Sequence, residues 1–264
     1  MPTLTELKRI CRKKNYHNYW SKIFSRHISI YFTWFFCHTP ITPNQLTFIQ
    51  IILAWLAGLS LIIWQWNGII AWIILMQLSF IFDLVDGEVA RYKKKSSLFG
   101  VILDSFGHVL INPAVYWSLA IFVYYQTFDV WIIYLTIILS IFLISPSKHA
   151  LMRGILFLTT KKDNPIYNYE NLSKQFKQEY LPPKQRNSSL KQVEKILKTI
   201  SEFPNDMNIF CILLILTLIF HNTLFTTIGL VFFSGLIIIK EFYFLYQIKK
   251  KNLIEKEYLK IYQK

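Results

Sequence analysis

Four side chains near the middle of the sequence have the residue types and spacing of a divalent-metal site. Asp83 and Asp86 are three residues apart, and Asp104 and His108 are four residues apart. On an α-helix, the members of each pair project from one face, with Cβ atoms about 5 to 6 Å apart. Carboxylate ligands with open coordination positions suit Mg2+ or Mn2+, which then also bind water and substrate phosphate. Carboxylates on two helices can hold two ions about 3.5 to 4 Å apart, so the pattern predicts a pair of Mg2+ or Mn2+ ions.

The residues between the two acidic pairs suit a phosphate-containing substrate. Gly87 and Ala90 remove side-chain bulk from the first helix, and Gly100 does the same on the facing helix, so a substrate can approach the backbone. Arg91 offers a planar guanidinium group for phosphate oxygens. Because a short loop joins the two helices, we expect them to be antiparallel neighbours whose acidic faces meet at the same depth. These features favour metal-assisted phosphoryl transfer.

The elements that carry these residues are predicted to be membrane helices. The chain is 53% hydrophobic and 17% aromatic, which is too apolar for an ordinary soluble domain. Several apolar runs approach or exceed the roughly 20 residues that cross a bilayer. We therefore predict an all-α integral membrane protein with six transmembrane helices. The predicted spans are 46–64, 69–89, 99–125, 130–158, 208–220 and 224–248.

The net charge of +14 comes from basic residues that are confined to separate stretches. The basic stretches are 8–26, 93–95, 161–198 and 249–251, whereas the turns at 65–67, 126–129 and 221–223 contain no Lys or Arg. By the positive-inside rule, the acidic site and both termini are cytoplasmic, in the inner membrane if the cell is bacterial. The basic N-terminal region is expected to face anionic lipid, and no nucleic-acid partner is expected.

Four segments follow from this pattern. Residues 1–40 are predicted to form an N-terminal amphipathic helix in the membrane interface, because apolar residues recur there at spacings of three and four. Residues 41–158 hold the first four spans and the acidic motif. Residues 159–206 are interpreted as a solvated cytoplasmic insert, and residues 207–264 hold two more spans and a basic cytoplasmic tail.

The spacing D-x2-D-G-x2-A-R-x8-G-x3-D, which begins at Asp83 and ends at Asp104, resembles the signature of the CDP-alcohol phosphotransferase (phosphatidyltransferase) family. The segment T-P-N-Q-L-T at 42–47 resembles the segment that this family places before its first span. The resemblance covers most of residues 20–158 and, by topology only, the remainder. It implies transfer of a phospho-alcohol group from a CDP-alcohol to an acceptor hydroxyl, with release of CMP and formation of a phosphodiester. It also implies a homodimer.

The resemblance also implies roles for individual residues. Asp83, Asp86 and Asp104 are expected to ligate the metals, and Arg91 to face the diphosphate. The residues expected at the CDP moiety are Asn44, Thr47, Asp83, Gly87, Ala90, Arg91 and Gly100. His108 stands where the family has a fourth Asp that is both general base and metal ligand. An imidazole can do either at neutral pH, so we expect His108 to be the base and to contribute to the metal site.

The acceptor is less well defined by the sequence. Lys148 and Arg153, near the cytoplasmic end of the fourth span, suit an acceptor phosphate as well as they suit a positive-inside flank. The segments D-G-E-V-A-R at 86–91 and R-H-I-S at 26–29 resemble family members that join inositol phosphate. The acceptor can therefore be a lipid, a sugar phosphate or a polyol phosphate, and the donor alcohol is also open.

Other functions are compatible with parts of the pattern. The changed base at His108 leaves open a catalytically weakened protein. A transporter could use the same acidic site to bind a cation, although it would favour ionisable residues near the bilayer midplane and broken helices in both halves. An aspartate-rich prenyltransferase would need a second acidic motif on another span, which this sequence lacks. The clustering of charge at one membrane face favours the transferase.

Overall fold

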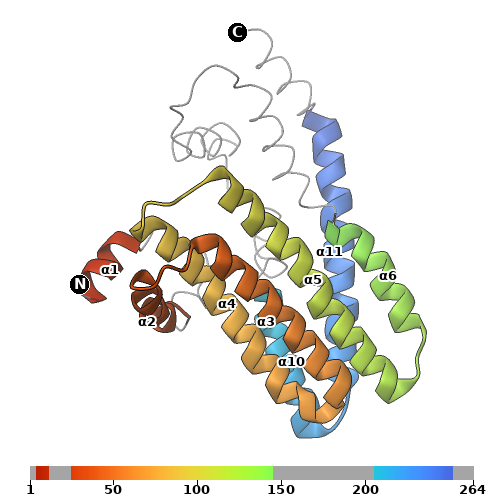
Figure 1. The fold of residues 1–264 in the computed structure, drawn as a ribbon. Helices are drawn as coiled ribbons and strands as arrows, with labels where there is room; N and C mark the ends of the chain where they lie inside the picture. The colour runs from red at the N-terminus through yellow and green to blue at the C-terminus, as the bar shows by residue number, and fades with distance from the viewer. Residues whose placement is uncertain (1–3, 12–24, 145–204, 252–264) are drawn as a thin grey trace.

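The computed structural model describes residues 4–11, 25–144 and 205–251, and the regular elements in these ranges are all helices (Figure 1). They are α1 (Leu4–Cys11), α2 (Arg26–Cys37), α3 (Pro43–Trp64), the 3-10 turn η2 (Gln65–Asn67), α4 (Gly68–Tyr92), α5 (Leu98–Thr127), α6 (Trp131–Ile144), α10 (Asn205–Phe220) and α11 (Leu224–Lys251). The predicted all-helical class is confirmed for these residues. The end of the predicted fourth span, nearly all of the polar insert and most of the basic tail lie outside them.

α3 and α4 form an antiparallel hairpin. Thr42 caps the start of α3: its hydroxyl accepts a hydrogen bond from the backbone N–H of Gln45, and the Gln45 side chain accepts one from the Thr42 N–H at 2.8 Å. At the other end, η2 reverses the chain. A Cβ atom on Gly68 would lie 2.2 Å from the carbonyl oxygen of Ser60, so only glycine fits this close turn.

Near the acidic residues, α3 is the central helix, because it packs against both α4 and α5 (Figure 1). Gly58 allows the α3–α5 approach: a Cβ atom there would lie 3.0 Å from the backbone oxygen of Ala114. In the described part of the chain, α4 and α5 share few close backbone contacts. Their side chains do meet, as the 3.1 Å hydrogen bond from Trp72 Nε1 to Ser118 Oγ shows, so α4 and α5 are neighbours whose backbones make few close contacts while both pack closely on α3.

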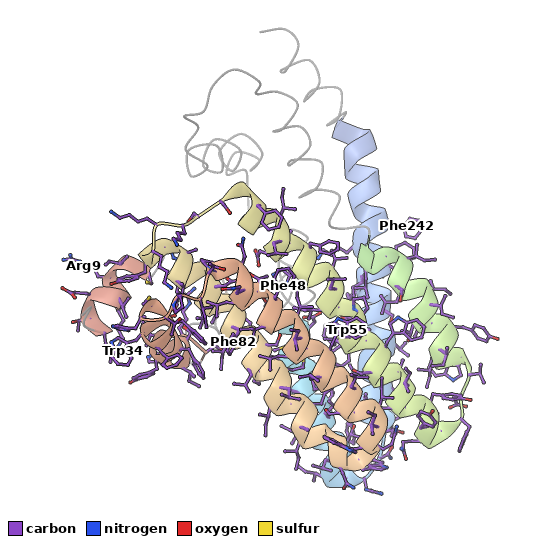
Figure 2. All side chains as sticks on the ribbon, viewed as in Figure 1. Arg9, Trp34, Phe48, Trp55, Phe82 and Phe242 are labelled. Atoms are coloured by element: carbon purple, nitrogen blue, oxygen red, sulfur yellow. The ribbon has the colours of Figure 1, made fainter. Side chains whose placement is uncertain are left out.

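Helices α3 to α6, α10 and α11 share one buried apolar core and expose apolar side chains outward. Phe48, Trp55 and Phe242 are examples of exposed aromatic residues (Figure 2). By length and composition, two stretches can cross a membrane: Pro43–Tyr92, which holds both α3 and α4, and Ile102–Thr127. Trp131–Leu143, Asn205–Phe220 and Leu224–Lys240 are shorter apolar helices. The six-span count stays a prediction.

The N-terminal region differs from the single amphipathic helix that the sequence predicts. Leu7 and Cys11 of α1 pack in one buried cluster with Ile30 of α2. A continuous straight helix would separate Cys11 from Ile30 by about 28 Å, so α1 and α2 are not parts of one straight helix. Both helices pack on α4. The prediction was wrong because periodicity reports the apolar face of a helix and not a break within it.

Candidate metal and substrate site

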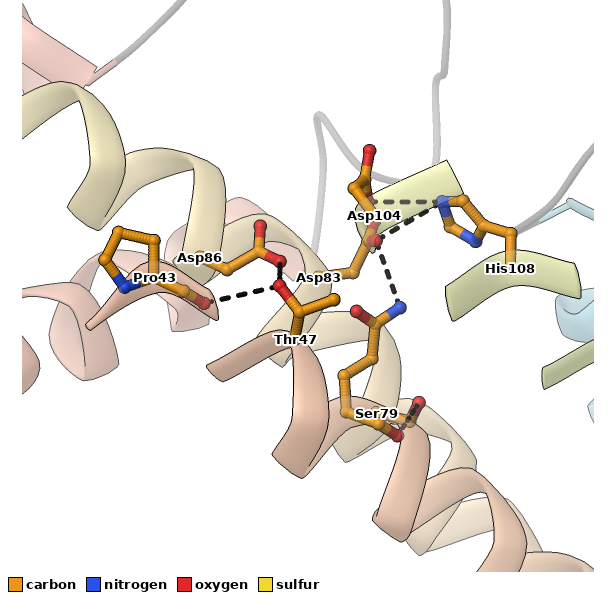
Figure 3. Close-up of polar contacts among 8 residues, drawn as sticks. Pro43, Thr47, Ser79, Asp83, Asp86, Asp104 and His108 are labelled. Carbon is orange, nitrogen blue, oxygen red and sulfur yellow. Dashed lines mark hydrogen bonds and ion pairs between the residues drawn. The ribbon is translucent and has the colours of Figure 1, made fainter. Parts of the chain in front are cut away.

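Three potential metal ligands lie close together at the ends of α4 and α5 that are predicted to face the cytoplasm. Asp83 comes from α4, and Asp104 and His108 come from successive turns of α5 (Figure 3). One ligand atom from each lies within 4.8 Å of the others. His108 Nε2 is 3.5 Å from Asp83 Oδ1 and 3.6 Å from Asp104 Oδ1. The imidazole therefore faces two carboxylates on two helices.

Asp86 lies one turn further along α4 and has a different environment. Its Oδ2 atom accepts a 2.6 Å hydrogen bond from the Thr47 hydroxyl of α3 (Figure 3). Both side chains are buried, with Asp86 8% exposed and Thr47 3% exposed. Asp86 is not part of the three-residue ligand group in the structure. The contact fixes one carboxylate oxygen of Asp86 and leaves its other oxygen for a further ligand.

Gln50 is a site residue that the sequence analysis missed. Its Nε2 donates a 3.1 Å hydrogen bond to Asp83 Oδ1, and its side chain is almost completely buried. Its backbone oxygen accepts a hydrogen bond from the hydroxyl of Ser79, one turn before Asp83 on α4. The signal in the sequence is the three-residue spacing from Thr47, which matches the spacing from Asp83 to Asp86. Two donors on α3 thus face two carboxylates on the antiparallel helix α4.

The ligand set fits a divalent cation. Two carboxylates supply the hard oxygen atoms that Mg2+ and Mn2+ prefer, and the neutral imidazole can add a nitrogen ligand. The side chains of Asp83, His108 and Asp104 are 17%, 32% and 46% exposed, so the group opens progressively toward α5 and solvent. A substrate phosphate and water can reach the open side. Asp83, Asp104 and His108 are the residues that would hold the ion.

Gly87, Gly100 and Arg91 lie at the same ends of α4 and α5 as the acidic residues. Arg91 Nε donates a 2.9 Å hydrogen bond to the backbone oxygen of Cys11, and a Cβ atom on Gly87 would lie 3.3 Å from Arg91 Nη1. The guanidinium group therefore lies over Gly87. A Cβ atom on Gly100 would lie 3.2 Å from Asn44 Oδ1, which places the start of α5 beside the start of α3. Ala90 is partly buried on α4.

These positions give the residues expected at the CDP moiety one common location. They gather at the ends of α3, α4 and α5 that carry the acidic side chains. Lys148 and Arg153, the residues considered for the acceptor phosphate, lie outside the described residues.

Comparison with known proteins agrees with the resemblance. Residues 40–166 match the family model described as CDP-alcohol phosphatidyltransferase. The chain carries a CDP-alcohol phosphatidyltransferase domain. CDP-alcohol phosphatidyltransferases are membrane-associated and typically depend on a divalent metal, and the family implies a transferase of phosphate-containing groups. No curated protein matches the chain.

The matched range contains every predicted site residue, from Asn44 to Arg153. It also contains Gln50, so the whole α3–α4–α5 arrangement belongs to the phosphatidyltransferase domain. α1 and α2 precede the matched range, and α10 and α11 follow it. The contacts that α1 and α2 make with α4 are therefore additions to this domain from a different part of the chain.

Proposed function

We propose that the protein transfers a phospho-alcohol group from a CDP-alcohol to an acceptor hydroxyl in a reaction that needs Mg2+ or Mn2+. The products are CMP and a phosphodiester. Asp83, Asp86, Asp104 and His108 surround the reacting phosphates, and the two carboxylates of α4 are already oriented by donors from α3. The observation that carries the proposal is the meeting of His108 with Asp83 and Asp104 inside a domain of this family.

The acceptor oxygen forms a bond to the alcohol-linked phosphorus, and the bond from that phosphorus to the CMP oxygen breaks. His108 Nε2 takes the acceptor proton, and the positive charge that the imidazole gains then faces Asp83 Oδ1 and Asp104 Oδ1. The CMP phosphate keeps the bond electrons. Arg91, whose guanidinium group lies over Gly87, can contribute positive charge that neutralises the diphosphate. Bound divalent cations would supply further neutralisation of the diphosphate and of the leaving group.

Because His108 uses the same nitrogen to face both carboxylates, that atom cannot hold a proton and a metal ion at once. We assign it to proton transfer during the reaction and to the metal site at rest. The chain places the base and the acidic residues on two helices that α3 holds in register. Catalysis then depends mainly on positioning and electrostatics, as is general for phosphoryl transfer.

The proposed setting is a multi-pass membrane protein with its site on the cytoplasmic face. The exposed apolar surfaces of α3 to α6, α10 and α11 support this setting, as does the absence of Lys and Arg from the three turns at the opposite end. The acceptor is a lipid or a phosphorylated polyol that reaches the open side of the site. A homodimer is part of the same proposal.

The reaction is tested by measuring CMP release from a panel of CDP-alcohols by the purified full-length protein. Each donor is incubated with a mixture of lipid and polyol-phosphate acceptors, with Mg2+, with Mn2+ or with EDTA. We expect CMP from at least one donor with either metal and none with EDTA. An absence of CMP from every donor under all acceptor mixtures would overturn the proposal.

Substitutions at His108 test the assigned base. His108→Ala should lower kcat by about 10²- to 10⁴-fold, because a general base contributes about that much. His108→Asp should retain or raise the activity, since it restores the carboxylate that the family has at this position. Full turnover by His108→Ala would show that the base is a different group.

A further inference from the structure

Glu88 is a buried carboxylate that the proposed reaction does not use. It lies two residues beyond Asp86 on α4 and points toward α2 instead of toward the acidic group. Its side chain accepts a 2.6 Å hydrogen bond from the Thr33 hydroxyl and hydrogen bonds of 3.2 and 3.3 Å from the Ser29 hydroxyl. Glu88 is 2% exposed, and both hydroxyl residues are fully buried. A buried carboxylate with this many donors is a specific contact between two helices.

The burial pattern of α2 follows from this contact. α2 turns Ser29, Thr33 and Arg26 inward, whereas Tyr31 and Phe35 are exposed. Among the described residues, Arg91 on α4 and Arg26 at the start of α2 contribute positive charge near Glu88. The two sequence segments that contain Arg26 and Glu88, R-H-I-S and D-G-E-V-A-R, thus meet in space.

α1 is joined to the same place. The Cys11 thiol donates a 3.4 Å hydrogen bond to the backbone oxygen of Glu88, and the backbone oxygen of Cys11 accepts the 2.9 Å hydrogen bond from Arg91 Nε. Cys11 is the last residue of α1 and is fully buried. Glu88 therefore binds α2 through its side chain and α1 through its backbone, while α1 in turn binds Arg91.

The contact with α1 determines where the guanidinium group of Arg91 lies. With Nε bound to Cys11, the two Nη groups remain for other partners, and Nη1 lies over Gly87. Without α1, nothing among the described contacts holds the Nε atom. A guanidinium group that is fixed at one nitrogen loses less side-chain entropy when it binds a phosphate.

We propose that Glu88 is a positioning residue that locks α1 and α2 onto α4 and thereby aims Arg91 at the phosphates of the donor. The docking of α1 and α2 stands on the contacts above, and the consequence for donor binding rests on the proposed function. Glu88 itself touches neither substrate nor metal.

The reactivity of the Cys11 thiol measures directly how α1 docks onto α4. In a Cys37→Ser, Cys211→Ser background, Cys11 is the only thiol, and its maleimide labelling rate measures how often α1 leaves α4. We expect Glu88→Leu to raise that rate at least tenfold. Because removal of the Glu88 charge also makes the thiol more acidic, Thr33→Val is the decisive second variant. It removes the shortest donor, keeps the charge, and should raise the rate at least threefold.

Asp206→Asn is the matched control, since Asp206 is another buried carboxylate, hydrogen-bonded to Tyr116 far from α1. It should leave Cys11 labelling unchanged. Unchanged labelling in both Glu88→Leu and Thr33→Val would overturn the docking role. Equal acceleration in Asp206→Asn would also overturn it, because the label would then report general destabilisation.

The effect on Arg91 is read from the kinetics of CMP release. Glu88→Leu should raise KM for the CDP-alcohol about tenfold and change kcat less than threefold. Arg91→Lys should have the same two effects, and the KM of the double variant should be no higher than that of either single variant. Loss of folded protein alone would lower kcat and leave KM unchanged, and that result would overturn the positioning role. If the wild-type protein released no CMP, the proposed function and the role of Arg91 would fail together, while the Cys11 labelling would still decide the docking.

Discussion

At the scale of single residues, the structure adds hydrogen-bond donors to the acidic ligands. Thr47 binds Asp86, and Gln50 binds Asp83. Each contact restricts the rotation of a carboxylate before a cation arrives, and partners of this kind raise metal affinity by orienting the ligand. The acidic residues and His108 could be identified from their spacing alone. Gln50 was missed because its only signal is the three-residue spacing from Thr47, and that spacing gains meaning only once α3 is known to lie opposite Asp83 and Asp86.

Gln50→Leu is expected to weaken Mn2+ binding about tenfold or more, because it removes the donor that orients Asp83. The dissociation constant of Mn2+ is measured by electron paramagnetic resonance on the purified protein. Gln77→Leu is the control: Gln77 also donates hydrogen bonds from a side-chain amide, which is partly buried, but to Asn208 and Cys211. Similar Mn2+ affinity in Gln50→Leu and the wild type would contradict the assigned role of Gln50.

The thiol of Cys37 is expected to react only at high pH. Burial disfavours the charged thiolate and, as the largest cause, raises the pKa of Cys37 to about 11, with Lys93 opposing this and Glu88 adding to it. At pH 8 only about one thiol in a thousand is then ionised, so the maleimide rate should rise about tenfold per pH unit up to pH 11.

The measurement uses a Cys11→Ser, Cys211→Ser background, in which Cys37 is the remaining thiol. An exposed cysteine introduced by Ser96→Cys into a protein without the native thiols provides the comparison, and its rate should level off near pH 9. A Cys37 rate that levelled off at the same pH would contradict the raised pKa.

At the scale of the helices, α3 decides the geometry of the site. The ends of α3, α4 and α5 agree with the predicted spans to within three residues, because caps and turn residues mark them in the sequence: Thr42 before α3 and the turn at Gln65–Asn67 are examples. The order of the helices in space was not predictable in the same way. A short loop favours neighbours, yet the backbones of α4 and α5 both pack more closely on α3 than on each other, and Gly58 allows the close approach of α5 to α3.

Gly68→Ala is expected to destabilise the α3–α4 hairpin by about 1 to 3 kcal/mol, as overpacking does in general. The added Cβ atom would lie 2.2 Å from a backbone oxygen that has no flexible side chain to move away. The apparent melting temperature of the purified protein, followed by tryptophan fluorescence, should fall by several degrees.

Gly235→Ala provides the matched control for this substitution. A Cβ atom on Gly235 would have no described neighbour within 4 Å, and Gly235 lies within α11. Alanine favours a helix over glycine by up to about 1 kcal/mol, so this variant should be as stable as the wild type or more stable. A larger loss of stability in Gly235→Ala than in Gly68→Ala would show that steric crowding at the turn is not the cause.

At the scale of the whole molecule, the residues that could take part in the reaction and the apolar outer surfaces occupy different regions. The acidic residues and Arg91 gather at one end of the helices, and the outer surfaces are apolar. Composition and charge distribution predicted this division, since both depend only on the numbers and positions of residue types. They could not predict how α1 and α2 pack, because that packing uses Ser29, Thr33 and Glu88, whose hydrogen bonds run between distant parts of the sequence.

The orientation in the membrane is tested with single cysteines in a protein without native thiols. Asn222→Cys lies in the turn between α10 and α11, and Ser96→Cys lies in the loop between α4 and α5, both at exposed positions. A membrane-impermeant maleimide should label Asn222→Cys in intact cells and Ser96→Cys only after permeabilisation. The reverse pattern would place the acidic site on the outer face.

The crowded turn at Gly68 has a further consequence for the spacing of the molecule. From Gly68 to Asp83 the helix advances about 22 Å, and the turn cannot absorb a change in that length. One inserted residue would rotate both α4 carboxylates by about 100° away from Thr47 and Gln50, which lie on a helix that starts from the same turn. Seven inserted residues would nearly restore the angle but move the carboxylates about 10 Å along the helix axis. The length of the hairpin therefore determines both the direction in which the carboxylates point and their distance from the turn at Gly68.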